Sequence, residues 1–129
     1  MNPQAQLHLD AATRNQTIAE RMLHQFDAGV EPPHDDWVIT MSFYSALHLV
    51  DAFLLEHRGA SPANHRSRTR LIESDDELDA AVEAYAMLKS LSELARYQPL
   101  HQFRPDSVQH AFDLLHEIRS HIGPTLDPD

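Results

Sequence analysis

The 129-residue chain contains no cysteine, only three glycines and a single lysine, and each shortage narrows what it can be. The absence of cysteine excludes disulfides and thiolate zinc sites, which fits a reducing cytosol. No alternation of apolar and polar residues is long enough to indicate a β-strand. The N-terminal segment lacks a basic region followed by an apolar run, so we expect no secretory signal and a cytoplasmic protein.

Positive charge is also scarce. Ten basic residues face twenty acidic ones, which gives a formal net charge of -10. Such a chain does not bind nucleic acid through diffuse electrostatics. Residues 57–72, however, contain no acidic side chain. Because arginine binds phosphate through a planar fork, this segment supplies candidate RNA- or nucleotide-binding residues. They are His65, Arg66, Arg68 and Arg70. The alternative is a solvated turn that balances the acidic stretch at residues 73–79.

Apolar residues at helical spacing predict an all-α fold. The expected helices are residues 11–28, a central one beginning after Asp35 or Asp36 and ending near Arg58, 75–97 and 107–122, with a short one at 65–72. The expected N-terminal caps are Asp10, Asp35 or Asp36, a Ser74–Glu77 capping box and Asp106. The expected stops are Gly29, Gly59, Pro99 and Gly123–Pro124. We therefore predict one domain, residues 1–129: an up-and-down four-helix bundle with one short extra helix, and flexible ends at 1–9 and 124–129.

One segment, Trp37 to Leu55, is nearly unbroken in its apolar character. Its polar interruptions and acidic flanks favour a buried helix of a soluble protein over a membrane span. Tyr44, His48 and Asp51 lie inside it. At about 100° per residue they fall within roughly 60° of one another, so they form one polar stripe. Buried polar groups need partners, and the stripe must therefore face other polar groups.

A second polar stripe, Tyr85, Lys89, Ser92 and Arg96, follows one edge of the predicted helix 75–97. The simplest arrangement sets the two stripes against each other, with Asp51 paired to Arg96 and His48 hydrogen-bonded nearby. The resulting structural polar seam has five members. They are Tyr44, His48, Asp51, Ser92 and Tyr97. The alternative is that the same groups line the floor of a cleft.

Arg96 and His101 are separated by four residues, a spacing that can serve phosphodiester cleavage. The histidine would move a proton, and the arginine would stabilise charge on the phosphorane. The alternative is a helix-terminal arginine and a surface histidine. No metal or cofactor is expected, because the spaced pairs Glu20–His24 and Asp113–His116 each stand alone.

Three segments together resemble the HEPN domains (higher eukaryotes and prokaryotes nucleotide-binding). They are Tyr44-Ser-Ala-Leu-His48-Leu-Val-Asp51-Ala52, Ser61-Pro-Ala-Asn-His65-Arg66 and Ser92-Glu-Leu-Ala-Arg96-Tyr97. The resemblance covers about Asp35 to His121. It implies a compact all-α bundle that is commonly homodimeric.

The resemblance also implies a function. Many HEPN domains are metal-independent endoribonucleases of toxin–antitoxin and other defence systems, and others bind RNA or nucleotides without catalysis. Active members carry an arginine, then four to six residues, then a histidine, and Arg96 and His101 match that pattern. The implied partners are RNA or a nucleotide, a second copy of the chain, and a cognate antitoxin or nucleotidyltransferase-like protein, with no membrane. The alternative is a non-catalytic protein-interaction module whose polar seam is structural.

Overall fold

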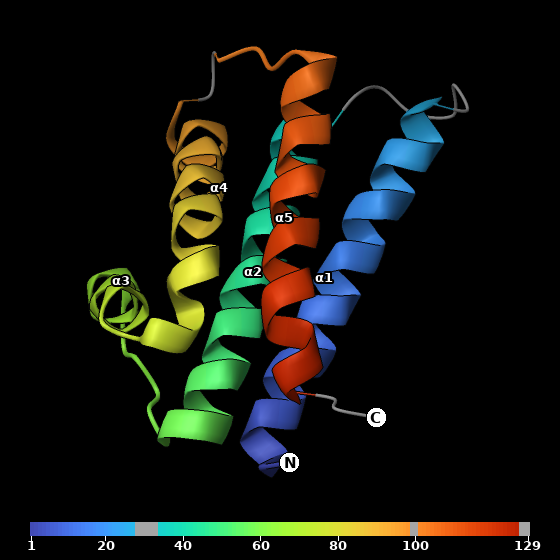
Figure 1. The fold of residues 1–129 in the computed structure, drawn as a ribbon. Coiled ribbons are helices and arrows are strands. Elements are labelled where there is room, and N and C mark those ends of the chain that lie inside the picture. Colours follow the sequence, from blue (N-terminus) through green and yellow to red (C-terminus); the bar gives the residue numbers. More distant parts are fainter. Residues whose placement is uncertain (28–33, 99–100, 127–129) are drawn as a thin grey trace.

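The computed structural model describes residues 1–27, 34–98 and 101–126, which form five α-helices, one short 3₁₀ helix and no strand (Figure 1). The elements are α1 (Pro3–Asp27), α2 (Asp35–Arg58), α3 (His65–Glu73), η1 (Asp76–Leu78), α4 (Asp79–Tyr97) and α5 (Pro105–Leu126). The four long helices lie side by side, and the short α3 lies outside them, next to the beginning of α4. The predicted all-α four-helix bundle with one short extra helix is confirmed.

Helix α2 is the centre of the bundle. It packs against α1, α4 and α5, and its large side chains Phe43 and Phe53 are at most 1% exposed. By length and composition α2 is the one described helix that could cross a membrane, but 78% of its most apolar window is buried inside the bundle. Small side chains bring α1 close, and the Ser45 hydroxyl donates a hydrogen bond of 2.7 Å to the Ala12 carbonyl. The composition that suggests a membrane span is therefore that of a core helix.

Helix α1 begins at Pro3, not at the predicted Ala11. Proline suits the first position of a helix, and the Asn2 side chain accepts a hydrogen bond of 2.8 Å from the Gln4 N–H. Asp10 thus lies inside the helix and does not cap it. Ala5 is fully buried, so the segment expected to be flexible packs against the core from Pro3 onward. The predicted stop at Gly29 lies outside the described residues.

The predictions for the two ends of α2 have different outcomes. His34 precedes the helix and makes no side-chain capping bond, whereas Asp35 and Asp36 lie in the first turn, where their charge favours the helix dipole. The predicted aspartate cap is therefore wrong. Gly59 ends the helix as predicted: it has a φ of 63°, which suits glycine, and its N–H donates to the Leu55 carbonyl at 3.2 Å.

The region after α2 holds the short helix that the sequence predicts, α3, which Asn64 caps by accepting a bond of 2.8 Å from the Ser67 N–H. The Ser74–Glu77 capping box does not form. Instead Asp75 accepts a bond of 3.1 Å from the Glu77 N–H, and the predicted helix 75–97 is divided into η1 and α4. The predicted stop at Pro99 lies outside the described residues.

Helix α5 is longer than predicted at both ends. It starts at Pro105, so Asp106 lies in its first turn and is not its cap. It also continues through Gly123 and Pro124 to Leu126, because Leu126 is only 4% exposed and its burial favours the last turn. The predicted stop at Gly123–Pro124 is therefore wrong. Residues 127–129 lie outside the described residues.

Candidate functional site

The polar stripe of α2 meets three different helices. Tyr44 accepts a hydrogen bond of 3.3 Å from Arg96 of α4, and His48 lies 2.9 Å from His8 of α1, Nδ1 to Nδ1. Asp51 pairs with Arg68 of α3. The predicted seam between two helices is therefore a junction around α2, and the predicted Asp51–Arg96 ion pair is wrong.

The Asp51–Arg68 pair is buried. Arg68 donates from Nε to one carboxylate oxygen at 2.7 Å and from Nη2 to the other at 3.0 Å, and each residue is 7% exposed. Burial is the largest single effect on the pKa of Arg68 and acts to lower it, but the hydrogen bonds that Arg68 donates to Asp51, the charge of Asp51 and the neighbouring Tyr85 together raise that pKa above its usual value. Arg68 is therefore committed to its carboxylate, and its prediction as a phosphate-binding residue is not supported by its surroundings.

Arg96 is held by hydroxyl groups and aromatic rings. Its nitrogens donate to the Ser92 carbonyl and hydroxyl, both at 3.2 Å, and to the hydroxyls of Tyr44 at 3.3 Å and Tyr97 at 3.4 Å. Its guanidinium carbon lies 5.0–5.6 Å from the ring centres of Phe43, Tyr44 and Tyr97. Among the described residues it has no carboxylate partner. The contacts fix the guanidinium in place and leave its charge unneutralised.

His65, at the first position of α3, lies beside this arginine. Its ring centre is 6.0 Å from that of Phe43, and its Nδ1 is 3.4 Å from Nη1 of Arg68. Burial lowers the pKa of His65, and the positive charges of Arg68, Arg96 and Lys89 lower it further, whereas the carboxylate of Glu93 acts in the opposite direction. Because arginine can only donate, Nδ1 is the acceptor in the contact with Arg68, and Nε2 of the neutral ring carries a proton that it can donate.

These groups form one surface, which we call the Arg96 face. It consists of Tyr44, His65, Lys89, Arg96 and Tyr97. Lys89 is paired with Glu93 at 3.0 Å, whereas Tyr97 is 66% exposed. The face combines a fixed guanidinium, a neutral imidazole and an exposed aromatic ring. Such groups can donate hydrogen bonds to a phosphate and stack on the base attached to it.

His101 lies in different surroundings. It lines a hollow of about 440 Å³, and its ring packs edge-on against Phe103 at 4.6 Å. The other lining residues are Asp35, Asp36, Ala95, Gln98 and Gln102. Within the part of the chain that the structure describes, Arg96 and His101 share no hydrogen bond. The predicted catalytic pair therefore stays a prediction, and carboxylates line the hollow at His101.

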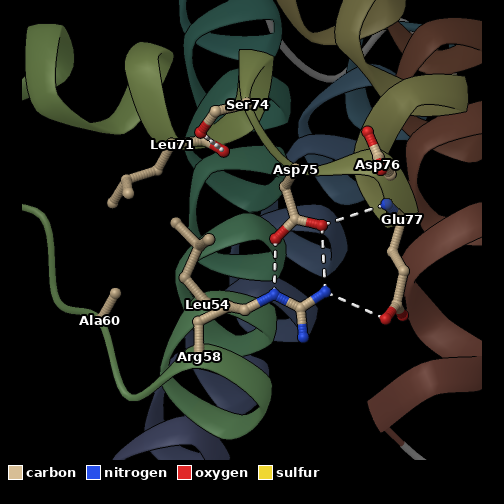
Figure 2. Close-up of a pocket in the computed structure, with 8 residues that line it drawn as sticks. All are labelled: Leu54, Arg58, Ala60, Leu71, Ser74, Asp75, Asp76 and Glu77. Carbon is tan, nitrogen blue, oxygen red and sulfur yellow. Dashed lines mark hydrogen bonds and ion pairs between the residues drawn. The ribbon is translucent and has the colours of Figure 1, made fainter.

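The other predicted binding residues are dispersed. Arg66 and Arg70 are exposed one turn apart on α3. Arg58, from the same cationic segment, instead reaches across a hollow of about 540 Å³ to the acidic turn before α4 (Figure 2). Its guanidinium donates hydrogen bonds to Asp75 at 2.7 Å and 3.0 Å and to Glu77 at 3.0 Å. These contacts connect the end of α2 to η1. Arg58, the arginine that lines the hollow, is therefore paired with carboxylates.

One residue of the site, His8, was missed by the sequence prediction, which placed it in a flexible end. A metal-ligating group results from its true position: nitrogens of His8 and His48 and an oxygen of Asp51 all lie within 4.8 Å of one another. Burial lowers the pKa of His48, as do His8, Arg14 and Arg68, while Asp51 acts in the opposite direction. Ala5 and Ala12 are both buried and lie one heptad apart in the sequence. This apolar spacing is the signal in the sequence that α1 starts before His8.

Comparison with known proteins adds no family: no protein-family model matches the chain, and a search of curated proteins finds no significant match.

Proposed function

We propose that this chain is a HEPN-like protein that binds RNA or a nucleotide at the Arg96 face. The observation that carries the proposal is the state of Arg96, whose guanidinium is fixed by hydroxyls and rings without a carboxylate among the described residues. A buried or half-buried arginine normally finds an anion. In a chain with a net charge of -10, an arginine that no carboxylate of the described residues pairs with fits a phosphate ligand.

Each member of the face has a distinct role in this proposal. Arg96 donates to the phosphate, and Lys89 adds a second positive charge. The exposed ring of Tyr97 stacks on a base, a contact worth about 1–3 kcal/mol per base. The neutral His65 donates a hydrogen bond from Nε2 to a ribose hydroxyl. Because the chain has a net charge of -10, the ligand is a nucleotide or a short single strand, and a long duplex is repelled.

RNA cleavage that uses Arg96 is a further part of the proposal. Metal-independent cleavage needs a histidine and an arginine at one phosphate. Within one chain His65 accompanies Arg96, so endoribonuclease activity through Arg96 and His101 requires that a second copy supply His101 in a homodimer. A dimeric ribonuclease of this kind fits a toxin of a toxin–antitoxin or other defence system, with an antitoxin as its protein partner.

The test is binding of fluorescein-labelled single-stranded RNA and of a labelled nucleotide, followed by anisotropy. We expect Arg96→Ala to weaken binding at least tenfold, since a charge-assisted contact is worth about 1.5–3 kcal/mol. Arg104→Ala, a second arginine that is exposed and lies outside the face, is the matched control and retains wild-type affinity. Equal affinity of the two variants would contradict the proposal. In a parallel cleavage assay, His65→Ala and His101→Ala identify the histidine that moves the proton.

The alternative function is a non-catalytic protein-interaction module. It is favoured by exposed apolar side chains on α4, where Met87 is 41% and Leu94 is 37% exposed, seven residues apart on one face of the helix. This alternative expects no RNA or nucleotide binding by the wild-type chain.

A further inference from the structure

We infer that His8, His48 and Asp51 form a binding site for one divalent transition-metal ion of the zinc class. Their ligand atoms lie within 4.8 Å of one another. His48 and Asp51 are three residues apart on α2, the spacing that places two ligands on one side of a helix, and α1 supplies the third. The inference uses residues outside the Arg96 face and does not rest on the proposed function.

The two histidines already converge on one point. Their Nδ1 atoms face each other at 2.9 Å, which requires one ring to donate a proton and the other to accept it. A tetrahedral ion about 2.0–2.1 Å from each nitrogen holds the two nitrogens roughly 3.3 Å apart. For both Nδ1 atoms to bind one ion, the donor ring shifts to its other tautomer, which moves its proton from Nδ1 to Nε2 and frees the second lone pair. An opening of a few tenths of an ångström then makes room for the metal ion between the two nitrogens.

Asp51 is oriented as the third ligand of the metal ion. Arg68 donates to both of its oxygens, at 2.7 Å and 3.0 Å, and each carboxylate oxygen keeps a further lone pair. Metal-binding carboxylates are commonly oriented by such an outer partner. His8 and His48 are half-buried, whereas Asp51 is buried, so the group is open on the histidine side. Two imidazoles and a carboxylate are the ligand set of zinc sites that keep an open position.

The surrounding charge decides what completes the coordination. Arg14 and Arg68 both act on His48 as positive neighbours and oppose a bare dication. They favour an anionic fourth ligand such as hydroxide or inorganic phosphate, because such a ligand lowers the net charge of the assembly. We therefore expect zinc affinity to increase when phosphate is added.

The test is titration of the full chain with Zn²⁺ by calorimetry, and with Co²⁺ by its visible absorption, which reports the coordination geometry. We expect one equivalent bound by the wild type. His8→Ala and His48→Ala should each bind at least about tenfold more weakly, since loss of even an outer partner of a ligand weakens binding about 10–100-fold. The matched control is His110→Ala, an exposed histidine of α5, which should bind like the wild type.

Circular dichroism and thermal unfolding establish that each variant is folded. If His48→Ala does not fold, His8→Ala decides, because His8 lies near the start of α1. Zinc binding that is equal in His8→Ala and His110→Ala would overturn the inference, since it would come from scattered surface histidines. Absence of a Co²⁺ spectrum in the wild type at millimolar metal would also overturn it, and the His8–His48 contact would then be a hydrogen bond only.

Discussion

At the scale of single residues, the Asp51–Arg68 pair is the clearest determinant of stability. Arg68→Ala leaves the Asp51 carboxylate buried without a partner, which destabilises the fold by about 3–5 kcal/mol. The measurement is urea unfolding at neutral pH. The matched control is Arg66→Ala, two residues away and exposed, which should stay within about 0.5 kcal/mol of wild type. An Arg68→Ala cost no larger than that of Arg66→Ala would mean that water reaches Asp51.

The same pair shows what residue patterns can and cannot predict. The sequence correctly required polar partners for Tyr44, His48 and Asp51. It assigned Arg96 to Asp51 and missed Arg68, although both arginines lie on predicted helices. The choice depends on where the six-residue connection from Gly59 to Asn64 places α3, and that placement is tertiary.

At the scale of elements, the junction of α2 with η1 gives a pH dependence. The hydrogen bonds from Arg58 lower the pKa of Asp75 below its ordinary value of 3.8. A carboxyl group whose pKa is lower in the folded state than in the unfolded state stabilises the fold at every pH above its unfolded-state pKa. This stabilisation is lost as the pH falls through the folded-state pKa. Asp75→Asn should therefore lower the free energy of unfolding at pH 7, and the difference from wild type should shrink below about pH 4.

This variant is informative because asparagine keeps the side-chain oxygen that accepts the Glu77 N–H. The loss then reflects the ion pair and not the cap. Asp76→Asn is the matched control, because Asp76 is an exposed neighbour in η1 that does not pair with Arg58, and this variant should show no such pH dependence. A difference between Asp75→Asn and wild type that is constant from pH 7 to about pH 3 would contradict the assignment.

Helix existence was predictable from the sequence, whereas helix starts were not. Apolar periodicity identified all four long helices and α3. The start of α1 was missed because Asp10 precedes a recognisable apolar arc, while the true start depends on Asn2 and Pro3. That error removed His8 from consideration, and with it the partner of His48. A local capping rule cannot see that Ala5 is buried against another helix.

At the scale of the whole molecule, an acidic body carries a small cationic face. A net charge of -10 repels an extended polyanion, and only Arg96 and Lys89 bring positive charge to the Arg96 face. Each phosphate contact on a single strand contributes about -0.7 to the slope of log affinity against log salt. Lys89 is paired with Glu93, so one to two phosphate contacts predict a shallow slope of about -0.7 to -1.4 for RNA binding.

The slope locates the binding surface, because it counts phosphates. Measured between about 50 and 200 mM KCl, it should become less negative by about 0.7 in Arg96→Ala and stay unchanged in Arg70→Ala. Arg70 is exposed on α3 but lies outside the face, so it serves as the control. A slope that flattens in Arg70→Ala and not in Arg96→Ala would assign RNA to the exposed arginines of α3. Arg96, which has no carboxylate partner within residues 1–27, 34–98 and 101–126, would then need another explanation in this acidic chain.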